Sequence, residues 1–168
     1  MIKISVLSLG ILMSLGAYAE SIKVQMQPKS ESKISGDITL TQVGEKVQIK
    51  TDLKGFSPNS KHGFHVHETG DCSDAQAKKA GGHFNPTNHN HGQAHSKSSH
   101  LGDLGNLRSD KDGKINSTQS FSGLTLNKGK MNSIISRSLI IHSAADDLKS
   151  QPSGNAGARI ACGVIGAK

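Results

Sequence analysis

Gly63-Phe64-His65-Val66-His67-Glu68 is the most informative stretch of this 168-residue sequence. Its two histidines are one residue apart, a spacing that places both imidazoles on one face only if the segment is a β-strand. Phe64 and Val66 favour a strand and would point the opposite way, into a core. Imidazole is a ligand for copper, zinc, iron and nickel, so the stretch predicts a strand that presents two metal ligands. The alternative is a pair of surface histidines on an edge strand.

Further potential ligands follow along the chain and strengthen the prediction of a metal site. They are His83, His91, His100, Asp103 and His142. Several of them lie in residues 69–101, which are mostly polar and have little regular pattern. A structureless segment of this length inside a compact domain is usually functional or disordered. Its histidines indicate that a bound metal orders it.

Short alternating patterns of apolar residues predict strands on both sides of the histidine pair. The expected strands, besides the one with the pair, are residues 21–27, 34–43, 47–53, 103–107, 114–121, 138–142 and 160–165. A second polar loop is expected over residues 144–157. Gly is abundant, apolar content is modest and helical periodicity is hard to find, so the sequence predicts an all-β domain with two long functional loops.

The first nineteen residues are expected to be a signal peptide. Lys3 gives a positive start, residues 4–15 are apolar but short for a bilayer, and Ala17-Tyr18-Ala19 is a small-x-small cleavage site. Cleavage after Ala19 would leave residues 20–168 as one domain exported to a bacterial periplasm. An uncleaved membrane anchor is the alternative, and it is disfavoured because no basic stop-transfer cluster follows.

The chain is basic, with a formal net charge of +7. Nucleic acid is a poor match for this charge, because no aromatic residue lies in a basic cluster that could stack on bases. We expect no nucleic-acid partner, and no membrane contact after cleavage. A small anionic substrate stays open. The aromatic residues that remain after cleavage are Phe56, Phe64, Phe84 and Phe121.

Cys72 and Cys162 are the two cysteines of the sequence. In an exported protein an even count suggests a disulfide, and two cysteines allow one pairing. Closing so long a loop is worth about 4–5 kcal/mol in the chain-entropy model. The alternative is a pair of unrelated buried thiols. No CxxC motif supports a thioredoxin-like role.

Together these segments resemble the copper/zinc superoxide dismutase family over essentially all of residues 20–168. The matching segments are Gly63-Phe64-His65-Val66-His67-Glu68, Gly81-Gly82-His83-Phe84-Asn85-Pro86, His91-Gly92, His100-Leu101-Gly102-Asp103-Leu104-Gly105-Asn106, Ser138-Leu139-Ile140-Ile141-His142, and the closing segment from Gly154 to Ile165. The resemblance implies an eight-stranded Greek-key β-barrel, related to the immunoglobulin-like sandwiches.

The resemblance also implies one copper and one zinc per subunit, which share a histidine. The implied copper ligands are His65, His67, His83 and His142. The implied zinc ligands are His83, His91, His100 and Asp103. An imidazole bound through both nitrogens is deprotonated, which is favourable only between two cations.

By the same resemblance, the activity is dismutation of superoxide to oxygen and hydrogen peroxide by copper redox cycling. His83 would leave copper and carry a proton. Arg159 would receive the anion beside copper, since its guanidinium binds small anions; a surface salt bridge is the plainer role for an arginine. Asp146 would link His65 to His91 and orient both rings, where a solvated loop carboxylate is the plainer role.

Other positions fit the family less closely. His62 is expected to be structural, and His89 and His95 to be exposed, with help in metal loading as a weaker alternative. Ala144 stands where many members carry a steering lysine, and Lys149 is a weak substitute for it. A monomer and a homodimer both stay open.

The rival function is a non-catalytic periplasmic protein that binds or stores copper or zinc. The ligands alone would allow it, but storage needs neither Arg159 nor a shared His83. A copper-only enzyme of related fold is disfavoured because all four zinc positions are present.

Overall fold

The structure is a computed structural model that describes residues 21–94 and 96–166. The expected signal peptide, residues 1–19, and His95 lie outside the described residues. The elements in chain order are β1 (Ser21–Pro28), β2 (Ser35–Val43), β3 (Lys46–Lys54), β4 (Lys61–His67), the short 3-10 turn η1 (Lys78–Ala80), β5 (Asp103–Arg108), β6 (Lys114–Ser122), β7 (Ser138–His142) and β8 (Arg159–Val164). The expected all-β class is confirmed. For the seven strands with expected bounds, no observed end differs from the expected one by more than one residue.

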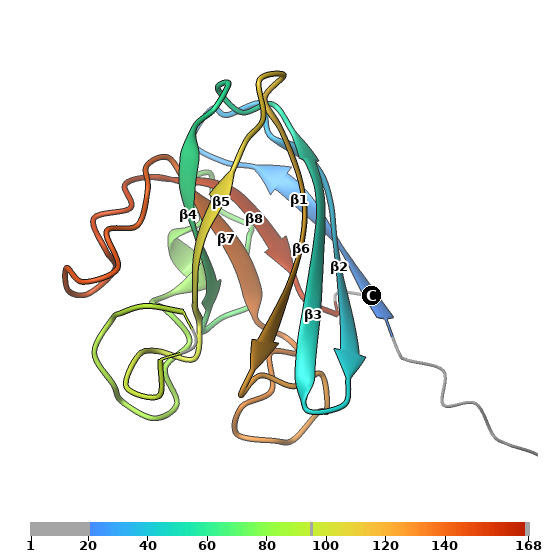
Figure 1. Cartoon of the computed structure of the whole chain (residues 1–168), viewed down its shortest axis with the longest axis vertical. Helices are drawn as coiled ribbons and strands as arrows, with labels where there is room; N and C mark the ends of the chain where they lie inside the picture. Colours follow the sequence, from blue (N-terminus) through green and yellow to red (C-terminus); the bar gives the residue numbers. More distant parts are fainter. Residues whose placement is uncertain (1–20, 95, 167–168) are drawn as a thin grey trace, which may run out of the picture.

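The eight strands form one antiparallel sheet in the order β5-β4-β7-β8-β1-β2-β3-β6. The sheet curls until its two end strands, β5 and β6, approach each other, which nearly closes a barrel (Figure 1). Neighbours such as β4 and β7, or β8 and β1, are far apart in sequence. These long connections are those of a Greek key.

The β2–β3 hairpin shows how the sequence builds the barrel wall. Val43 pairs with Lys46 across a two-residue turn, in which Gly44 has φ of +56°. Ile38 and Leu40 alternate inward and are fully buried, as period-2 patterning requires. Phe64 and Val66 of β4 are buried in the same apolar core, as expected. This packed interior holds β4 rigidly in place.

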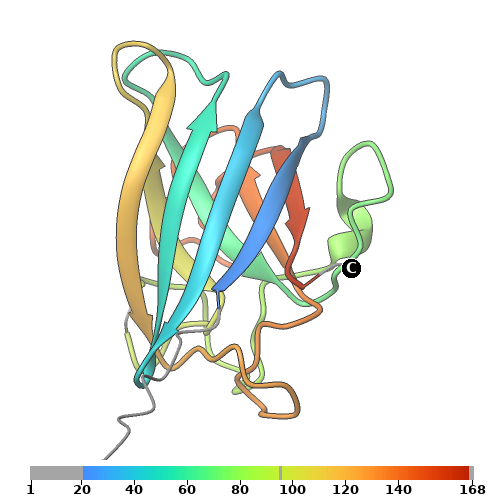
Figure 2. The same cartoon turned by 90° about the vertical axis from the view of Figure 1, so that its right-hand side faces the viewer.

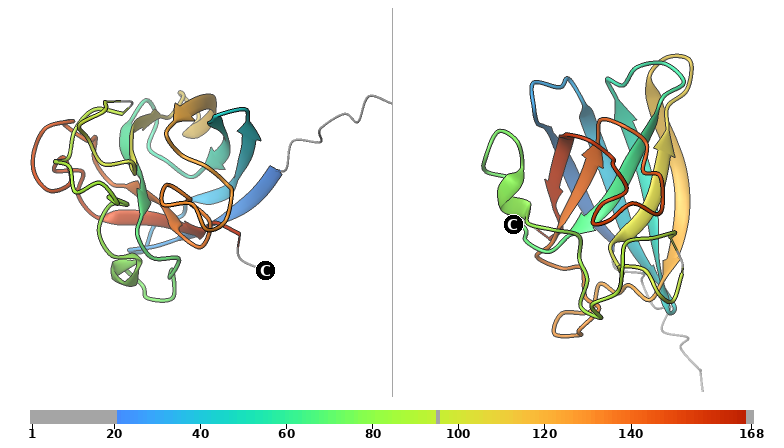
Figure 3. Two further views of the ribbon diagram at one scale, coloured as in Figure 1. Left: turned by 90° about the horizontal axis from the view of Figure 1, so that it is seen from below. Right: turned by 90° about the vertical axis from the view of Figure 1, so that its left-hand side faces the viewer.

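Two long loops lie outside the β5-β4-β7-β8 side of the barrel, one over residues 68–102 and one over residues 143–158 (Figure 3). The face made by β1, β2, β3 and β6 is left uncovered by them (Figure 2). Residues 68–102 hold one piece of regular structure that the sequence did not predict, η1. It forms because the Asp74 carboxylate accepts the backbone N–H groups of Lys78 and Lys79. Among the described residues, no helix has the length and apolar content needed to cross a membrane.

Candidate metal centre

Strand β4 presents His65 and His67 on the face opposite the apolar core. Both are nevertheless buried, at 0% and 1% exposure, because β4 lies between β5 and β7 and the long loops cover this face. They are therefore not the surface histidines of an edge strand. On the neighbouring β7, Ile140 is the partner of His65, and His142 ends the strand two residues later.

Four histidines meet at one point, and they are the expected copper set, His65, His67, His83 and His142. Each offers a ring nitrogen within 4.8 Å of the others. Two strands supply three of them, and His83 comes from the first long loop. A backbone bridge between His67 and His83 brings that loop against the end of β4.

One nitrogen of each ring in this set is buried and has no hydrogen-bond partner among the described residues. These atoms are His65 Nδ1, His67 Nε2, His83 Nε2 and His142 Nε2. Buried polar atoms without partners are rare, and they point to a missing ion or water. Four convergent imidazole nitrogens fit copper, which accepts such ligands in both of its common oxidation states.

The second nitrogen of three of these rings is tied down. His67 Nδ1 donates to the Gly81 carbonyl at 2.9 Å, and His142 Nδ1 donates to the Gly157 carbonyl at 3.1 Å. His65 Nε2 donates to Asp146 Oδ2 at 2.8 Å. Such contacts fix the tautomer that leaves the other nitrogen free for a metal. Burial lowers the pKa of His65 to about 4 and that of His142 to about 3, so both rings are neutral at pH 7, as metal ligands must be.

The expected zinc set gathers on the other side of His83. Asp103 Oδ1 lies 2.8 Å from His83 Nδ1, 3.0 Å from His91 Nδ1 and 3.2 Å from His100 Nδ1. The Nδ1 atoms of His83 and His100 are 3.4 Å apart. Ligands at 2.0–2.1 Å from a tetrahedral zinc ion would be about 3.3 Å from each other. The donor set and its spacing therefore fit zinc, with His83 facing both sets through different nitrogens.

The electrostatics of the zinc set favour a cation. Burial disfavours a charged His91, but hydrogen bonds to Asp103 and Asp146 outweigh it and raise the pKa of His91 to about 9. Burial would raise the pKa of Asp103, but hydrogen bonds from His83 and His91 hold it well below its usual range. Two ionised carboxylates thus draw a positive charge to this place, and a zinc ion would supply it.

Asp146 lies between the two sets. Its Oδ2 accepts from His65 Nε2 at 2.8 Å and its Oδ1 accepts from His91 Nε2 at 2.9 Å. The carboxylate is buried, and Asn106 holds its backbone through both N–H and C=O. It is therefore not a solvated loop acid.

Arg159 begins β8 at the edge of the copper set, where it pairs with His142. Its Nη1 and Nη2 donate to the carbonyls of Ala77 and Gly81 at 2.6 and 2.7 Å. The guanidinium makes no ion pair with any described carboxylate. The alternative role of Arg159, a surface salt bridge, is therefore wrong. Its side chain lines an open pocket of about 440 Å³.

Two further residues near these groups were not predicted from the sequence. Lys78 lines the same pocket as Arg159, whereas Lys149 does not. Gln151 holds His91 in place: its Oε1 accepts the His91 N–H at 2.8 Å and its Nε2 donates to the His91 carbonyl at 2.9 Å. The basic pair Lys78-Lys79 soon after Cys72 was a usable signal, but nothing in the sequence marks Gln151.

Of the remaining histidines, the structure describes His62 and His89, and both lie as expected. His62 is buried, and its Nδ1 donates to the backbone carbonyl of His142 at 2.8 Å, which is a structural contact. His89 is exposed and contacts Thr87 and the Ser99 carbonyl.

Cys72 and Cys162 form the expected disulfide, with a sequence separation of 90. It joins the first long loop to β8, three residues after Arg159. The disulfide thereby attaches to the barrel the part of the loop whose carbonyls, at Ala77 and Gly81, hold Arg159.

Comparison with known proteins places this arrangement in a family. Residues 34–165 match the model of the family described as copper/zinc superoxide dismutase (SODC). Superoxide dismutase [Cu-Zn] 2 of Aquifex aeolicus is 38% identical over 164 residues, which is 95% of this chain and 96% of the relative. Superoxide dismutase [Cu-Zn] of Schizosaccharomyces pombe is 44% identical over 146 residues, 82% of this chain and 93% of the relative.

Solved structures agree with the sequence relatives. A double mutant of a SOD-like protein from Bacillus subtilis superposes with a TM-score of 0.78 at 36% identity, and the match covers 85% of this chain and 95% of the other. Fold, sequence and paired ligand sets therefore coincide. The chain belongs to the copper/zinc superoxide dismutase family.

Proposed function

We propose that the protein dismutes superoxide to oxygen and hydrogen peroxide. In this proposal copper is held by His65, His67, His83 and His142, and zinc by His83, His91, His100 and Asp103. One observation carries it: the ring of His83 offers one nitrogen to a cluster of imidazole nitrogens that have no hydrogen-bond partner among the described residues, and the other nitrogen to the cluster that contains the Asp103 carboxylate. A storage site needs no such shared ring.

When bound, copper would supply a one-electron donor and acceptor, and zinc a fixed positive charge. In this proposal His83 moves a proton. Its Nε2 faces the copper set without a partner among the described residues, while its Nδ1 is held at Asp103. A proton taken up at Nε2 can therefore be delivered to reduced oxygen in the same place.

In this proposal Arg159 holds the substrate. Its backbone pairs with that of His142, two carbonyls hold its guanidinium, and Arg159 lines a pocket that is open to solvent. A fixed, unpaired guanidinium attracts a small anion and orients it. Asp146 acts indirectly, by orienting His65 and His91.

The test is metal analysis of the purified protein together with a superoxide-dismutation assay. We expect one copper and one zinc per chain and fast turnover. Arg159→Ala should lower kcat/KM about tenfold or more, because hydrogen bonds to charged groups are worth about 1.5–3 kcal/mol. Its metal content should not change, and Arg159→Lys should recover part of the loss.

Bound metal without turnover would instead favour the non-catalytic storage protein. Unchanged kinetics in Arg159→Ala would refute the role of that residue alone and leave the metal assignment standing.

We also propose that residues 1–19 are a signal peptide and that residues 20–168 act in the periplasm. The support is the order of Lys3, an apolar run and Ala17-Tyr18-Ala19. N-terminal sequencing of the protein recovered from a periplasmic extract should begin at Glu20. An intact Met1 in the cell-associated protein would contradict cleavage of this segment.

A further inference from the structure

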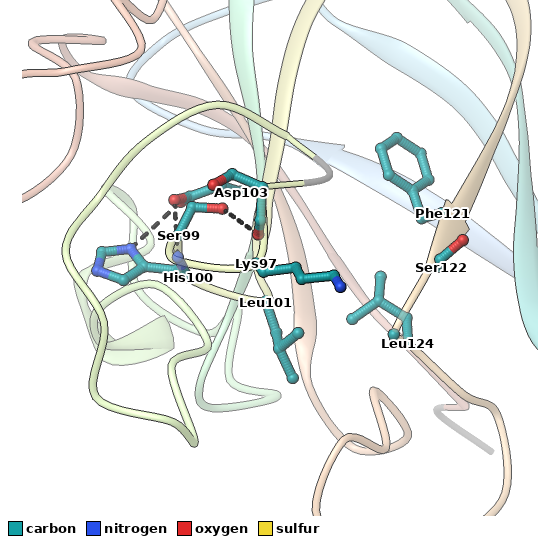
Figure 4. Close-up of a pocket in the computed structure, with 10 residues that line it drawn as sticks. Lys97, Ser99, His100, Leu101, Asp103, Phe121, Ser122 and Leu124 are labelled. Carbon is teal, nitrogen blue, oxygen red and sulfur yellow. Dashed lines mark hydrogen bonds and ion pairs between the residues drawn. The ribbon is translucent and has the colours of Figure 1, made fainter.

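A cavity of about 260 Å³ lies behind the zinc set, away from the pocket that contains Arg159. Figure 4 shows His100 and Asp103 on one side of it and Ser122 and Leu124 of the opposite wall on the other. The side chain of Lys97 extends between the two sides. Nothing in the proposed reaction uses this cavity.

The other side chains of the zinc set are less accessible than that of His100. His91 and Asp103 have fully buried side chains, and that of His83 is 4% exposed. Gln151 clamps the backbone of His91, and Asp146 occupies its outer nitrogen. The side chain of His100 is the most exposed of the set, at 9%, and it borders the cavity.

We propose that zinc enters and leaves its site through this cavity, past the imidazole of His100, and that Lys97 slows its entry. A space of this size holds several waters, so a partly hydrated cation fits in it. The exposed ammonium group of Lys97 lies along the route and repels a divalent cation. The inference rests on the zinc ligands assigned under the proposed function.

A larger side chain in the wall of the cavity tests the route. Ser122 is exposed at the end of β6 and lines the cavity, so Ser122→Phe would narrow it. Ser120 is also exposed, two residues earlier on the same face of the strand, and it does not line the cavity. Ser120→Phe is therefore the matched control. The readout is transfer of zinc from the loaded protein to the chelator 4-(2-pyridylazo)resorcinol, followed by absorbance.

We expect Ser122→Phe to slow both zinc release and zinc uptake several-fold with the same final zinc occupancy. Ser120→Phe should exchange zinc at the unaltered rate. Wild-type rates in Ser122→Phe, or equal slowing in the two variants, would overturn the route. Failure of the unaltered protein to bind one zinc would instead overturn the ligand assignment.

A charge change tests the role of Lys97 without altering the shape of the route. At low ionic strength, Lys97→Glu should speed zinc uptake by the metal-free protein about threefold, and high salt should reduce the gain. Lys97→Gln should give an intermediate rate. Uptake rates that do not follow the charge at residue 97 would overturn this part of the proposal.

Discussion

The two halves of the metal centre are built on different supports. Three of the four residues of the copper set lie on the barrel strands β4 and β7. In the zinc set, three residues come from the loop of residues 68–102, and Asp103 lies where that loop ends. The packed core therefore holds three of the four copper-set residues in place before any metal binds, whereas His83 and the zinc set depend on whatever holds the loop.

The charges differ in the same way. The copper-set rings of His65, His67 and His142 have a lowered pKa and are neutral, and the zinc set has an ionised carboxylate in contact with a histidine of raised pKa. The strand-borne half is a rigid neutral pocket. The loop-borne half needs a cation to complete it, so zinc contributes to folding as well as to placing His83.

Removing the disulfide should have the largest effect and should affect the loop-borne half first. Replacement of Cys72 and Cys162 by serine frees a loop with a separation of 90 residues. The chain-entropy model predicts that the free energy of unfolding falls by about 4–5 kcal/mol. Denaturant unfolding and metal analysis should show less stability and earlier loss of zinc than of copper. Earlier loss of copper would break the comparison.

Asp146→Asn should separate the two halves, because Asp146 contacts one histidine from each. Loss of such an outer contact lowers metal affinity about 10–100-fold. Zinc should be affected most, since His91 lies on the loop while β4 still holds His65. Competition with chelators measures both affinities. Asp147→Asn, at the exposed neighbouring carboxylate, is the control. An equal loss of affinity for zinc and for copper in Asp146→Asn would contradict the view that strands support one set and a loop the other.

In the metal-free protein, the copper-set histidines and His91 of the zinc set should give opposite pH responses. His65 and His142 have folded pKa values of about 4 and about 3, below the unfolded value of about 6.5. The unfolded state binds more protons in this window, so stability is lost as pH falls below 6.5. The folded pKa of His91 is about 9, so its contribution is present below pH 6.5 and is lost as pH rises through 9.

Urea midpoints of the metal-free protein from pH 4 to 9 check this prediction. His142→Gln should reduce the acid loss, and His91→Gln should reduce the alkaline loss. Asp103 and Asp146 stay ionised over this range, because hydrogen bonds outweigh burial and keep the pKa of each below its usual value. A flat profile would show that the charge contrast is not coupled to folding.

The smallest expected effect concerns steering of the substrate. Lys78 lines the pocket of Arg159 and Lys149 does not, so the first loop supplies the positive charge that the second lacks at Ala144. Lys78→Gln should lower kcat/KM by about threefold or less at low ionic strength and not at high salt. Lys149→Gln should leave it unchanged. A larger effect of Lys149→Gln than of Lys78→Gln on kcat/KM would show that the second loop attracts the substrate instead.

Much of this centre follows from local pattern. The alternation in Gly63-Phe64-His65-Val66-His67-Glu68 is enough to place two imidazoles opposite a buried Phe64 and Val66, because side chains in a strand alternate. The structure agrees with that prediction and with the strand series around it. The turn η1 was missed, since it depends on the side chain of Asp74 rather than on a repeating pattern.

The sequence by itself determined the strands, the disulfide pairing and which residue types could bind metal. These depend on the alternation of apolar residues, on the even number of cysteines and on the ligand chemistry of the side chains. Only the tertiary structure decided that His83 faces two clusters at once, that Gln151 clamps His91, and that Lys78 rather than Lys149 accompanies Arg159. The physical reason is distance along the chain. Those contacts join residues from separate loops, and their geometry exists only after the barrel has closed and the disulfide has attached the first loop to it.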